Sequence, residues 1–365
     1  MPEPITQDLA VPGLVVGTYT EPEQSTSEGV YSCSFDPASG RLGLRGVVAD
    51  FPNPSFLAVH PTNGCVYTVN ERGTFEGQPG GGLTALSVDP ESGAMTVLGR
   101  TNSGGEDPCY VSIEASGRYL LVANYISGSV AMVPIRGDAT LEAPSDVVAH
   151  SGSSVHPQRQ DSPYAHSIVP DPSNTFAVAC DLGTDTLTVY RMDLLAGKLV
   201  PHLEVTVPPG SGPRHLAFHP RRPMAYVVCE LSSSVLAFAF DAAEGTLELV
   251  QEVSALPDGV EARASTAADI HVTPDGRYVY ASNRGHDSLA CFAVGGDGLL
   301  VARHWTDCGG ATPRGFVIDP TGRYLVVANQ DSNTLVAFHV DAATGELTIT
   351  GDPLEVPMPV CPRFT

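Results

Sequence analysis

Six segments of this chain repeat one pattern at intervals of roughly fifty residues, which is the period of four-stranded propeller blades. In each, an apolar run leads into a turn of the Pro-Asp-Gly-Arg type, and a second apolar run such as Tyr324-Leu-Val-Val-Ala-Asn329 follows. This order predicts a β-hairpin, and two further short runs complete four strands. The repeats begin at Asn53, Asp107, Ser162, Gly212, Asp269 and Thr312.

The two ends of the chain together supply a seventh repeat. Gly13-Leu-Val-Val-Gly-Thr-Tyr-Thr20 resembles a second strand and residues 29–36 a third, so the missing first strand is expected from the tail, around residues 357–362. Such a composite blade would close the ring and remove open sheet edges. With 37 Gly, 31 Pro and no linker, the sequence predicts an all-β, seven-bladed β-propeller of four-stranded antiparallel blades, as a single domain over residues 1–365.

The charge of the chain argues against several classes of partner. The formal net charge is −22 and Lys198 is the only lysine, so a diffuse basic surface for nucleic acid or an anionic membrane is not expected. The N-terminus lacks the basic start and apolar stretch of a secretory signal, and no later run is long enough to span a bilayer. We expect a cytoplasmic protein.

Eight cysteines are spread at about one per repeat, mostly within apolar runs, and no Cys-x-x-Cys pair occurs. They are interpreted as small buried residues in a reducing compartment. A zinc site would need clustered ligands, and a catalytic thiol would need a histidine partner that is not obvious in the sequence. Neither is favoured.

One varying polar residue per repeat is expected at a common face of the ring. In a hairpin, the start of the first strand and the end of the second lie at the same edge. The second strands are expected to end ten residues after the turn proline, or eleven residues after it in the third repeat; Ala115 takes the place of the proline in the second repeat. The residues at these ends are Glu71, Tyr125, Asp181, Glu230, Arg284 and Gln330. The residue just before each of these is always Asn or Cys. A constant position followed by a variable polar one is typical of a common scaffold that holds a ring of different polar side chains.

The first-strand starts add Arg214 and Arg314 at one position and His215 and Asp269 at the next. Counted from the turn, His166 replaces an apolar core residue found in the other repeats, and it is expected two residues along the strand from the equivalent of Arg214. His166, Arg214, Glu230 and Arg284 then form an acid/base and anion-binding group. Glu71, Tyr125 and Gln330 are more simply explained as rim residues, His215 as a framework residue, and Arg314 and Asp269 equally well as ion-pair partners between blades.

Residues 150–162 form a long polar insertion just before the strand that carries His166. This connection lies on the face of the ring, so it could cover a substrate and contribute Arg159 or Gln160. A flexible Ser/Gly connector explains the same composition equally well.

Several motifs resemble the lactonase family of seven-bladed β-propellers, which contains bacterial 6-phosphogluconolactonases and fungal carboxy-muconate lactonising enzymes. The likeness covers nearly the whole chain. The motifs are Gly17-Thr-Tyr-Thr20, Arg159-Gln160, Pro163-Tyr-Ala-His166, Gly212-Pro-Arg-His215, Cys229-Glu-Leu231, Ser282-Asn-Arg-Gly-His286, Thr312-Pro-Arg-Gly315 and Pro359-Val-Cys361.

The resemblance implies that the family's active-site histidine, arginines and glutamate fall on His166, Arg214, Arg284 and Glu230. It implies no metal and no other cofactor, and the sequence shows no dense carboxylate motif that would suggest calcium. Tyr164 departs from the pattern, because many relatives are expected to carry a second histidine there.

Lactone hydrolysis needs a base to activate water, donors for the oxyanion and an acid for the leaving alkoxide. Glu230 or neutral His166 could be the base, and Arg214 and Arg284 could hold the oxyanion or an anionic group of the substrate. The favoured function is hydrolysis of a sugar lactone, above all 6-phosphogluconolactone, with Arg159, Gln160, Asp181, Asp269, Arg314, Gln330 and Glu71 as further substrate-binding candidates. Cyclisation of a muconate carboxylate and a non-enzymatic interaction scaffold remain as alternatives.

Overall fold

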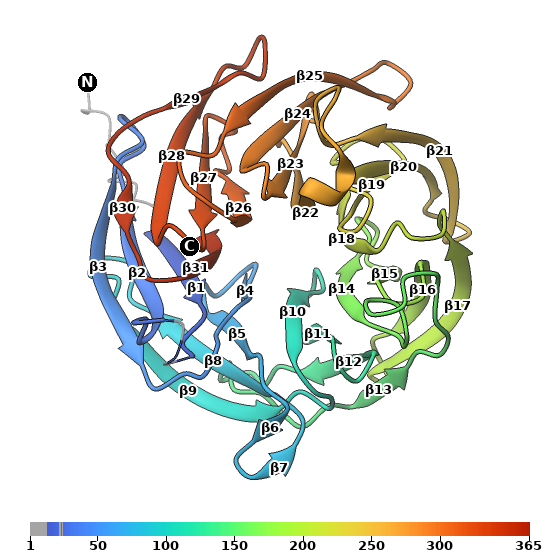
Figure 1. Cartoon of the computed structure of the whole chain (residues 1–365). Coiled ribbons are helices and arrows are strands. Elements are labelled where there is room, and N and C mark those ends of the chain that lie inside the picture. The colour runs from blue at the N-terminus through green and yellow to red at the C-terminus, as the bar shows by residue number, and fades with distance from the viewer. Residues whose placement is uncertain (1–12, 22, 24) are drawn as a thin grey trace, which may run out of the picture.

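Seven antiparallel sheets surround a central channel in the computed structural model, which describes residues 13–21, 23 and 25–365 (Figure 1). Each sheet has four strands in radial order, and one carries an additional short strand. The predicted seven-bladed β-propeller is therefore confirmed. Residues 1–12 of the expected unit lie outside the described residues.

Six blades are built from consecutive strands, with the innermost strand first in the chain. The first three are β4 (Leu57–Val59), β5 (Val66–Asn70), β8 (Gly82–Val88) and β9 (Met95–Asn102); β10 (Pro108–Ile113), β11 (Tyr119–Asn124), β12 (Ser129–Pro134) and β13 (Asp146–Ala149); and β14 (Ala165–Pro170), β15 (Phe176–Asp181), β16 (Thr186–Asp193) and β17 (Lys198–Thr206).

The next three follow the same order around the ring. They are β18 (Pro213–Phe218), β19 (Met224–Cys229), β20 (Ser234–Asp241) and β21 (Thr246–Ser254); β22 (Thr266–Val272), β23 (Tyr278–Arg284), β24 (Ser288–Val294) and β25 (Leu300–Asp307); and β26 (Pro313–Ile318), β27 (Tyr324–Asn329), β28 (Thr334–Val340) and β29 (Leu347–Ile349), with β30 (Leu354–Glu355) also paired to β28.

The seventh blade joins both ends of the chain, as the sequence predicts. It has the order β3 (Leu42–Ala49), β2 (Gly29–Phe35), β1 (Gly13–Thr18) and β31 (Pro359–Phe364). Leu14 pairs with Phe364 and Val16 with Pro362 in an antiparallel ladder. The C-terminal strand is thus the innermost strand of a blade whose other strands begin the chain, and this pairing closes the ring.

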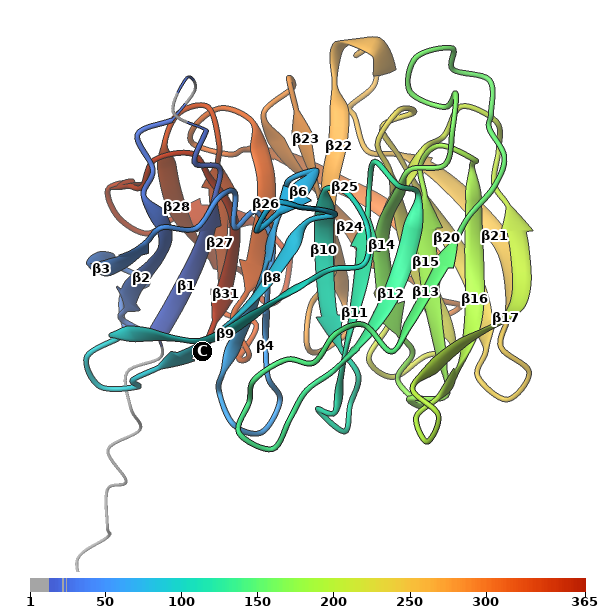
Figure 2. The ribbon, with the colours of Figure 1, turned by 90° about the horizontal axis from the view of Figure 1, so that it is seen from below.

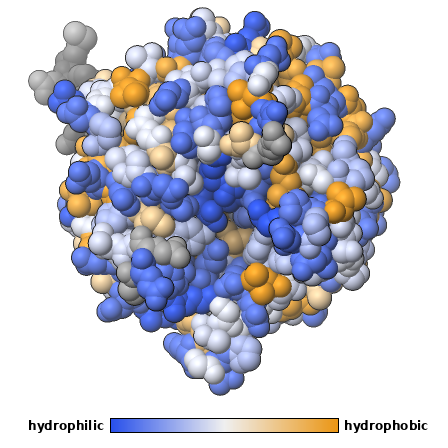
Figure 3. All heavy atoms as spheres, in the orientation of Figure 1, coloured by the Kyte–Doolittle hydropathy of each residue, from blue (hydrophilic) through white to orange (hydrophobic). Residues whose placement is uncertain are grey.

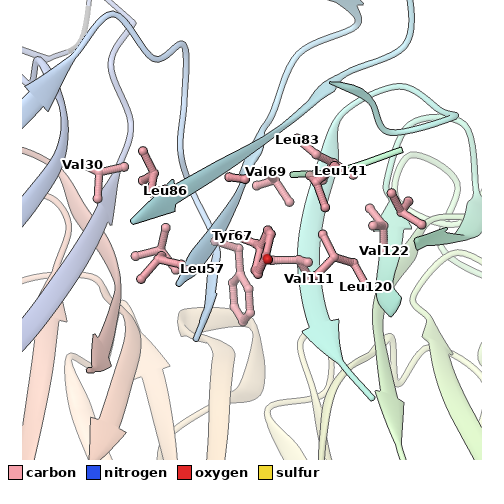
Figure 4. Packing of buried hydrophobic residues seen from close by; sticks show 14 of the residues in the cluster. Val30, Leu57, Tyr67, Val69, Leu83, Leu86, Val111, Leu120, Val122 and Leu141 are labelled. Carbon is pink, nitrogen blue, oxygen red and sulfur yellow. The ribbon is translucent and has the colours of Figure 1, made fainter. Parts of the chain in front are cut away.

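Apolar side chains fill the space between adjacent blades (Figure 4). The cluster drawn there combines residues of neighbouring blades, such as Leu57, Val69 and Val122, all fully buried. Tyr67 is also fully buried, and its hydroxyl donates to the backbone oxygen of Ala139 at 3.0 Å. Because strands alternate their side chains between two faces, each middle strand packs against both neighbours, which explains the unbroken apolar runs in the sequence.

Two short elements lie outside the blades. The hairpin of β6 (Thr74–Phe75) and β7 (Gln78–Pro79) extends from the first repeat, and a short 3₁₀ turn, η1 (Ala262–Ala264), precedes β22. Figure 2 shows β6 and the C-terminus on opposite sides of the disc. Within the described part of the chain, no helix is long and apolar enough to cross a membrane.

The third repeat is out of register with the count made from the sequence. Its turn, residues 170–174, contains two prolines, and Asp171 is the residue that accepts hydrogen bonds from the start of the second strand. Leu182, rather than Asp181, makes the backbone hydrogen bond that Glu230 makes in the next blade. The prediction that Asp181 is the varying strand-end residue is therefore wrong, because the count started from Pro170, whereas Pro172 is the equivalent of Pro220 in the next blade.

The same shift changes the interpretation of His166. Ile168 pairs with the second strand of its blade as Leu216 does in the following blade, so Ile168 fills the apolar core position. His166 lies instead at the position of Arg214. The prediction that His166 replaces a core residue is wrong, although the comparison still singled out a residue of the central ring.

Candidate active site

Six of the seven innermost strands contain a β-bulge at the same end. A bulge leaves a residue without a cross-strand partner and re-aims its side chain, which is why bulges are frequent near active sites. Here the bulges turn side chains toward the channel. The bulged residues are Cys109, His166, Arg214, Ala268 with Asp269, Arg314 and Val360.

A second ring follows the ends of the second strands. Tyr19, Glu71, Tyr125, Leu182, Glu230 and Gln330 share the same backbone hydrogen bond to the entrance of the neighbouring first strand, and Arg284 ends β23 at the equivalent point. The two rings together put polar side chains around the central hollow that Figure 3 shows as hydrophilic. The expected custom ring on one face of the scaffold is thus present.

Glu230 lies at the centre of a cluster of three arginines. Its Oε2 accepts from Arg214 Nε at 3.0 Å and lies 2.9 Å from Arg284 Nη2. Its Oε1 accepts from Arg159 Nη2 at 2.5 Å. Arg214 and Glu230 are 3% and 4% exposed, so these charges interact with little screening by water.

These contacts set the charge state of the cluster. Burial alone would raise the pKa of Glu230, but the guanidinium groups of Arg284, Arg214 and Arg159, with His166, hold it well below its usual range. Burial lowers the pKa of Arg284 to about 10, against the attraction of Glu230. Glu230 is therefore a carboxylate at neutral pH, with an excess of positive charge around it.

Arg214 is oriented by a chain of hydrogen bonds that ends on Asp269. His215 Nδ1 donates to Asp269 Oδ1 at 2.8 Å, and Arg214 Nη1 donates to His215 Nε2 at 3.1 Å and to the Ala268 carbonyl at 2.5 Å. Burial and the charge of Arg214 lower the pKa of His215 to about 3. A neutral His215 accepts from the arginine on one side and donates to the aspartate on the other, so this pair holds the guanidinium in place.

His166 is buried beside the arginine cluster. Its Nε2 lies 4.0 Å from Glu230 Oε2, and its Nδ1 lies 3.6 Å from the sulfur of Cys109. Burial, together with the positive charge of Arg214, lowers the pKa of His166 well below its usual value. The imidazole is therefore neutral at pH 7 and has a lone pair available. The thiol of Cys109, whose pKa burial raises, stays protonated and can donate to the His166 carbonyl oxygen at 3.5 Å.

Glu71 and Arg314 lie on the other side of this cavity. Tyr19 donates to Glu71 Oε2 at 3.0 Å and accepts from Arg314 Nη2 at 2.7 Å, and Ser55 also donates to the Glu71 carboxyl. Burial raises the pKa of Glu71, although Arg314 and the two hydroxyl groups oppose the shift. Glu71 is thus the carboxyl group of the site that binds a proton more readily than an ordinary glutamate.

The insertion of residues 150–162 reaches over the cavity, and Arg159 is its contribution. Ser154 donates to Asp185 at 2.5 Å, and Gln160 Nε2 donates to the Leu182 carbonyl at 2.9 Å. Gln160 is fully buried in these contacts. The segment is therefore held in place, and the expectation that it supplies Arg159 to the site agrees with the geometry.

These side chains line a cavity of about 250 Å³. Five of the sequence-based candidates are absent from its wall. Arg214 is bonded to Glu230 and lines a small adjoining hollow together with His166. Gln160 and Asp269 serve as described above; Asp181 accepts from three backbone amides and pairs with His150; and Gln330 donates to Asp331. The wall consists of Glu71, Cys109, Tyr125, Arg159, His166, Glu230, Arg284 and Arg314.

Sequence reasoning missed Tyr19 and Cys109. Cys109 occupies the position of Arg214 in its own repeat, and a count from the turn would have placed it there. Tyr19 follows β1 as Glu230 follows β19, but in the composite blade no turn joins the first strand, β31, to the second, β1, so no turn was available to count from. Among the described residues, no group of three His, Cys, Asp or Glu side chains is arranged to hold a metal ion.

Residues 13–364 match the family described as Lactonase, 7-bladed beta-propeller. The chain belongs to this lactonase family. The 6-phosphogluconolactonase of Bacillus subtilis is 39% identical to it over 352 residues, which are 96% of this chain and 97% of the relative. The 6-phosphogluconolactonase of Formosa agariphila is 32% identical over 340 residues, or 92% of this chain and 94% of the relative.

A solved structure of a periplasmic gluconolactonase from Pseudomonas aeruginosa superposes with a TM-score of 0.89 at 36% identity, covering 97% of this chain and 98% of that one. The resemblance derived from the motifs is thereby confirmed, and the chain is a lactonase-type enzyme. These relatives do not support the muconate cycloisomerase alternative.

Proposed function

We propose that this lactonase hydrolyses 6-phospho-D-glucono-1,5-lactone to 6-phosphogluconate, without a metal ion, in the cavity at the mouth of the propeller channel. The observation that carries the proposal is a neutral buried histidine beside a cavity with three arginines on its wall and a fourth, Arg214, bonded to Glu230. The relatives named 6-phosphogluconolactonase support the substrate class. The arginines offer an anion-binding site in a protein whose net charge of −22 would otherwise repel such a substrate.

His166 is the proposed general base. Glu230 is a poor candidate because its carboxylate is held by three guanidinium groups, which lower its affinity for a proton. The neutral imidazole can take a proton from water as the water oxygen attacks the lactone carbonyl. If Cys109 donates to the His166 carbonyl and its sulfur accepts from Nδ1, then Nε2 is the free nitrogen, which faces Glu230 and the cavity. We adopt this tautomer.

The arginines have separate tasks in this mechanism. Arg214 and Arg284 flank Glu230 beside His166, so their N–H groups can stabilise the negative charge that develops on the carbonyl oxygen. Arg159 is 38% exposed, against 3% for Arg214, and is available to a phosphate group. Arg314 and Glu71 line the opposite wall, where a protonated Glu71 can donate a proton to the leaving ring oxygen. The ester C–O bond breaks to give an alcohol and a carboxylic acid, which releases its proton to the solvent. His166 then loses the proton that it took from water, and Glu71 regains one through the solvent.

Arg284→Lys should raise KM for the phosphorylated lactone about tenfold while the protein stays folded. Lysine keeps the positive charge but loses the planar pair of donors that an anion or oxyanion can accept from. Steady-state kinetics would measure the change. Arg303→Lys, on the exposed outer strand β25, is the matched control. Equal KM and kcat in wild type and Arg284→Lys would exclude the proposed contact.

The pH dependence should show the lowered pKa of His166. A histidine at its usual pKa near 6.5 loses about nine-tenths of its base form by pH 5.5, whereas a depressed pKa keeps the base form present there. Hence kcat/KM should not fall between pH 7.5 and 5.5, because His166 keeps its base form and acidification only favours the protonated form of Glu71. Glucono-1,5-lactone is the suitable substrate, because a phosphate monoester itself titrates near pH 6. An acid limb centred near pH 6.5 would contradict this assignment.

The function itself is tested by adding purified protein to freshly generated 6-phosphogluconolactone in EDTA. We expect hydrolysis well above the spontaneous rate, with no response to added divalent cations. Failure to accelerate the reaction in EDTA, with recovery on addition of a metal, would reject metal independence. Failure under both conditions would reject the substrate, and closure of a diene acid would then restore the cycloisomerase alternative.

We also propose a cytoplasmic location. All eight cysteines are free thiols in the structure, as expected for a reducing compartment. A periplasmic location is the alternative, because one structural relative is described as a periplasmic gluconolactonase. Fractionation of the native host, with the thiols titrated in the fresh extract, would decide it.

A further inference from the structure

A second cavity lies in the channel beyond the layer of catalytic residues. Its volume is about 430 Å³, within the range of small-molecule sites. Its wall follows β4 and the parts of β10 and β26 that lie away from their bulges, and β31 contributes Arg363 and Phe364. No residue of this wall lines the 250 Å³ catalytic cavity.

Aromatic rings separate the two cavities. The rings of Phe56 and Tyr110 lie 4.2 Å apart between centroids, and both contact the imidazole of His215, at 5.6 and 5.0 Å. Phe56 and Tyr110 face the second cavity, whereas His215 contacts His166 on the catalytic side at 5.5 Å. The second cavity is therefore an open pocket that an aromatic layer separates from the catalytic cavity.

The second cavity is mainly apolar and carries one cation. Ala58, Val59, Ile113, Val317 and Phe364 are among its wall residues. The guanidinium of Arg363 lies over the ring of Phe56, 4.8 Å from the centroid, and it donates to the carbonyl of Pro362. An arginine at an apolar wall, with donors to spare, is suited to a carboxylate.

Arg363 makes no salt bridge with any described carboxylate, unlike the arginines around Glu230. Asp269 is the acidic group that acts on it through space, but that carboxylate already accepts from His215, His271 and two backbone amides. A cation retained without an ion pair in a chain of net charge −22 points to an anionic partner.

We propose that this second cavity binds a small organic carboxylate with an apolar body, with the carboxylate on Arg363 and the body along Ala58, Ile113 and Val317. The site is independent of the proposed lactone chemistry. Inorganic anions fit it poorly, because the mainly apolar wall would remove their hydration and offer few donors in return. A neutral apolar molecule would leave the guanidinium without its charge partner.

Calorimetric titration of the whole protein with octanoate is the test, with octanamide and inorganic phosphate as comparison probes. We expect one saturable octanoate site, which Arg363→Gln weakens about tenfold or more through loss of the charged hydrogen bonds. Arg118→Gln, an exposed arginine next to a turn of β11, is the control and should bind as wild type does. Octanamide and phosphate should bind much more weakly at this site.

The arginines of the catalytic cavity offer octanoate another position, which Arg284→Gln distinguishes. Binding that survives Arg284→Gln and is lost in Arg363→Gln supports the second site. The reverse pattern, equal binding of octanamide, or no binding at millimolar octanoate would overturn the proposal. If Arg363→Gln does not fold, Ala58→Met, which extends a side chain into the cavity, must abolish binding for the proposal to stand.

Discussion

His166→Ala should lower kcat for lactone hydrolysis by about 10²- to 10⁴-fold, the usual contribution of a general base. The structure explains why this side chain can carry that role. Burial and the neighbouring Arg214 keep the imidazole unprotonated, while the bulge at the start of β14 turns it toward the cavity. No other group on the cavity wall combines a free lone pair with this position, since Glu230 is engaged by arginines.

The measurement is kcat with 6-phosphogluconolactone, together with circular dichroism and thermal unfolding to verify the fold. His202→Ala is the matched control, because that histidine lies on the exposed strand β17 and donates only to the Glu244 carbonyl. It should leave kcat unchanged. A loss of less than about fivefold in a folded His166→Ala protein would remove His166 from proton transfer.

The architecture was accessible from the sequence because it is repetitive. Each blade repeats a turn and an apolar hairpin, so a period of roughly fifty residues is visible without knowledge of any contact. Even the composite blade follows from counting strands, since Gly13–Thr18 lacks an inner neighbour until the tail supplies Pro359–Phe364. Ring closure depends only on the order in which strands pair, and the repeated strand pattern of the sequence is enough to predict that order.

The wrong predictions arose where positions were assigned by counting residues along a repeat. Two prolines in residues 170–174 moved the third repeat out of register, which misplaced Asp181 and misassigned the role of His166. A bulge also inserts an extra residue whose side chain no alternation rule can direct. The sequence therefore indicated the correct end of the strands while leaving the order of residues around the ring unresolved.

The ion pairs of the site are the feature that the sequence predicts least. Arg159, Arg214 and Arg284 come from three different segments, and their convergence on Glu230 depends on the radial arrangement of blades. The sequence offered Glu230 as a possible base. In the structure it is the anion that holds three cations together, and for this reason we propose His166 rather than Glu230 as the base.

Glu230→Gln should reduce the free energy of unfolding by about 3–5 kcal/mol, the range for removing one partner of a buried ion pair. Glutamine has nearly the shape of glutamate, so no cavity forms. The loss arises because Arg214, which is buried, and Arg284, which is largely buried, are left beside each other without a carboxylate. Denaturant unfolding measures the effect, and Glu142→Gln, which breaks an exposed pair with Arg136, should change stability little.

Inorganic phosphate distinguishes this electrostatic cause from a general packing defect. An anion that takes the place of the lost carboxylate between the arginines would stabilise Glu230→Gln more than it stabilises the wild type, because ligand binding to the folded state adds to its stability. The variant should also lose turnover, since Arg214 and Arg284 would no longer be held beside His166. If Glu230→Gln unfolds at the wild-type denaturant concentration and phosphate stabilises both proteins equally, the carboxylate does not organise the arginines, and its assignment as their anchor is wrong.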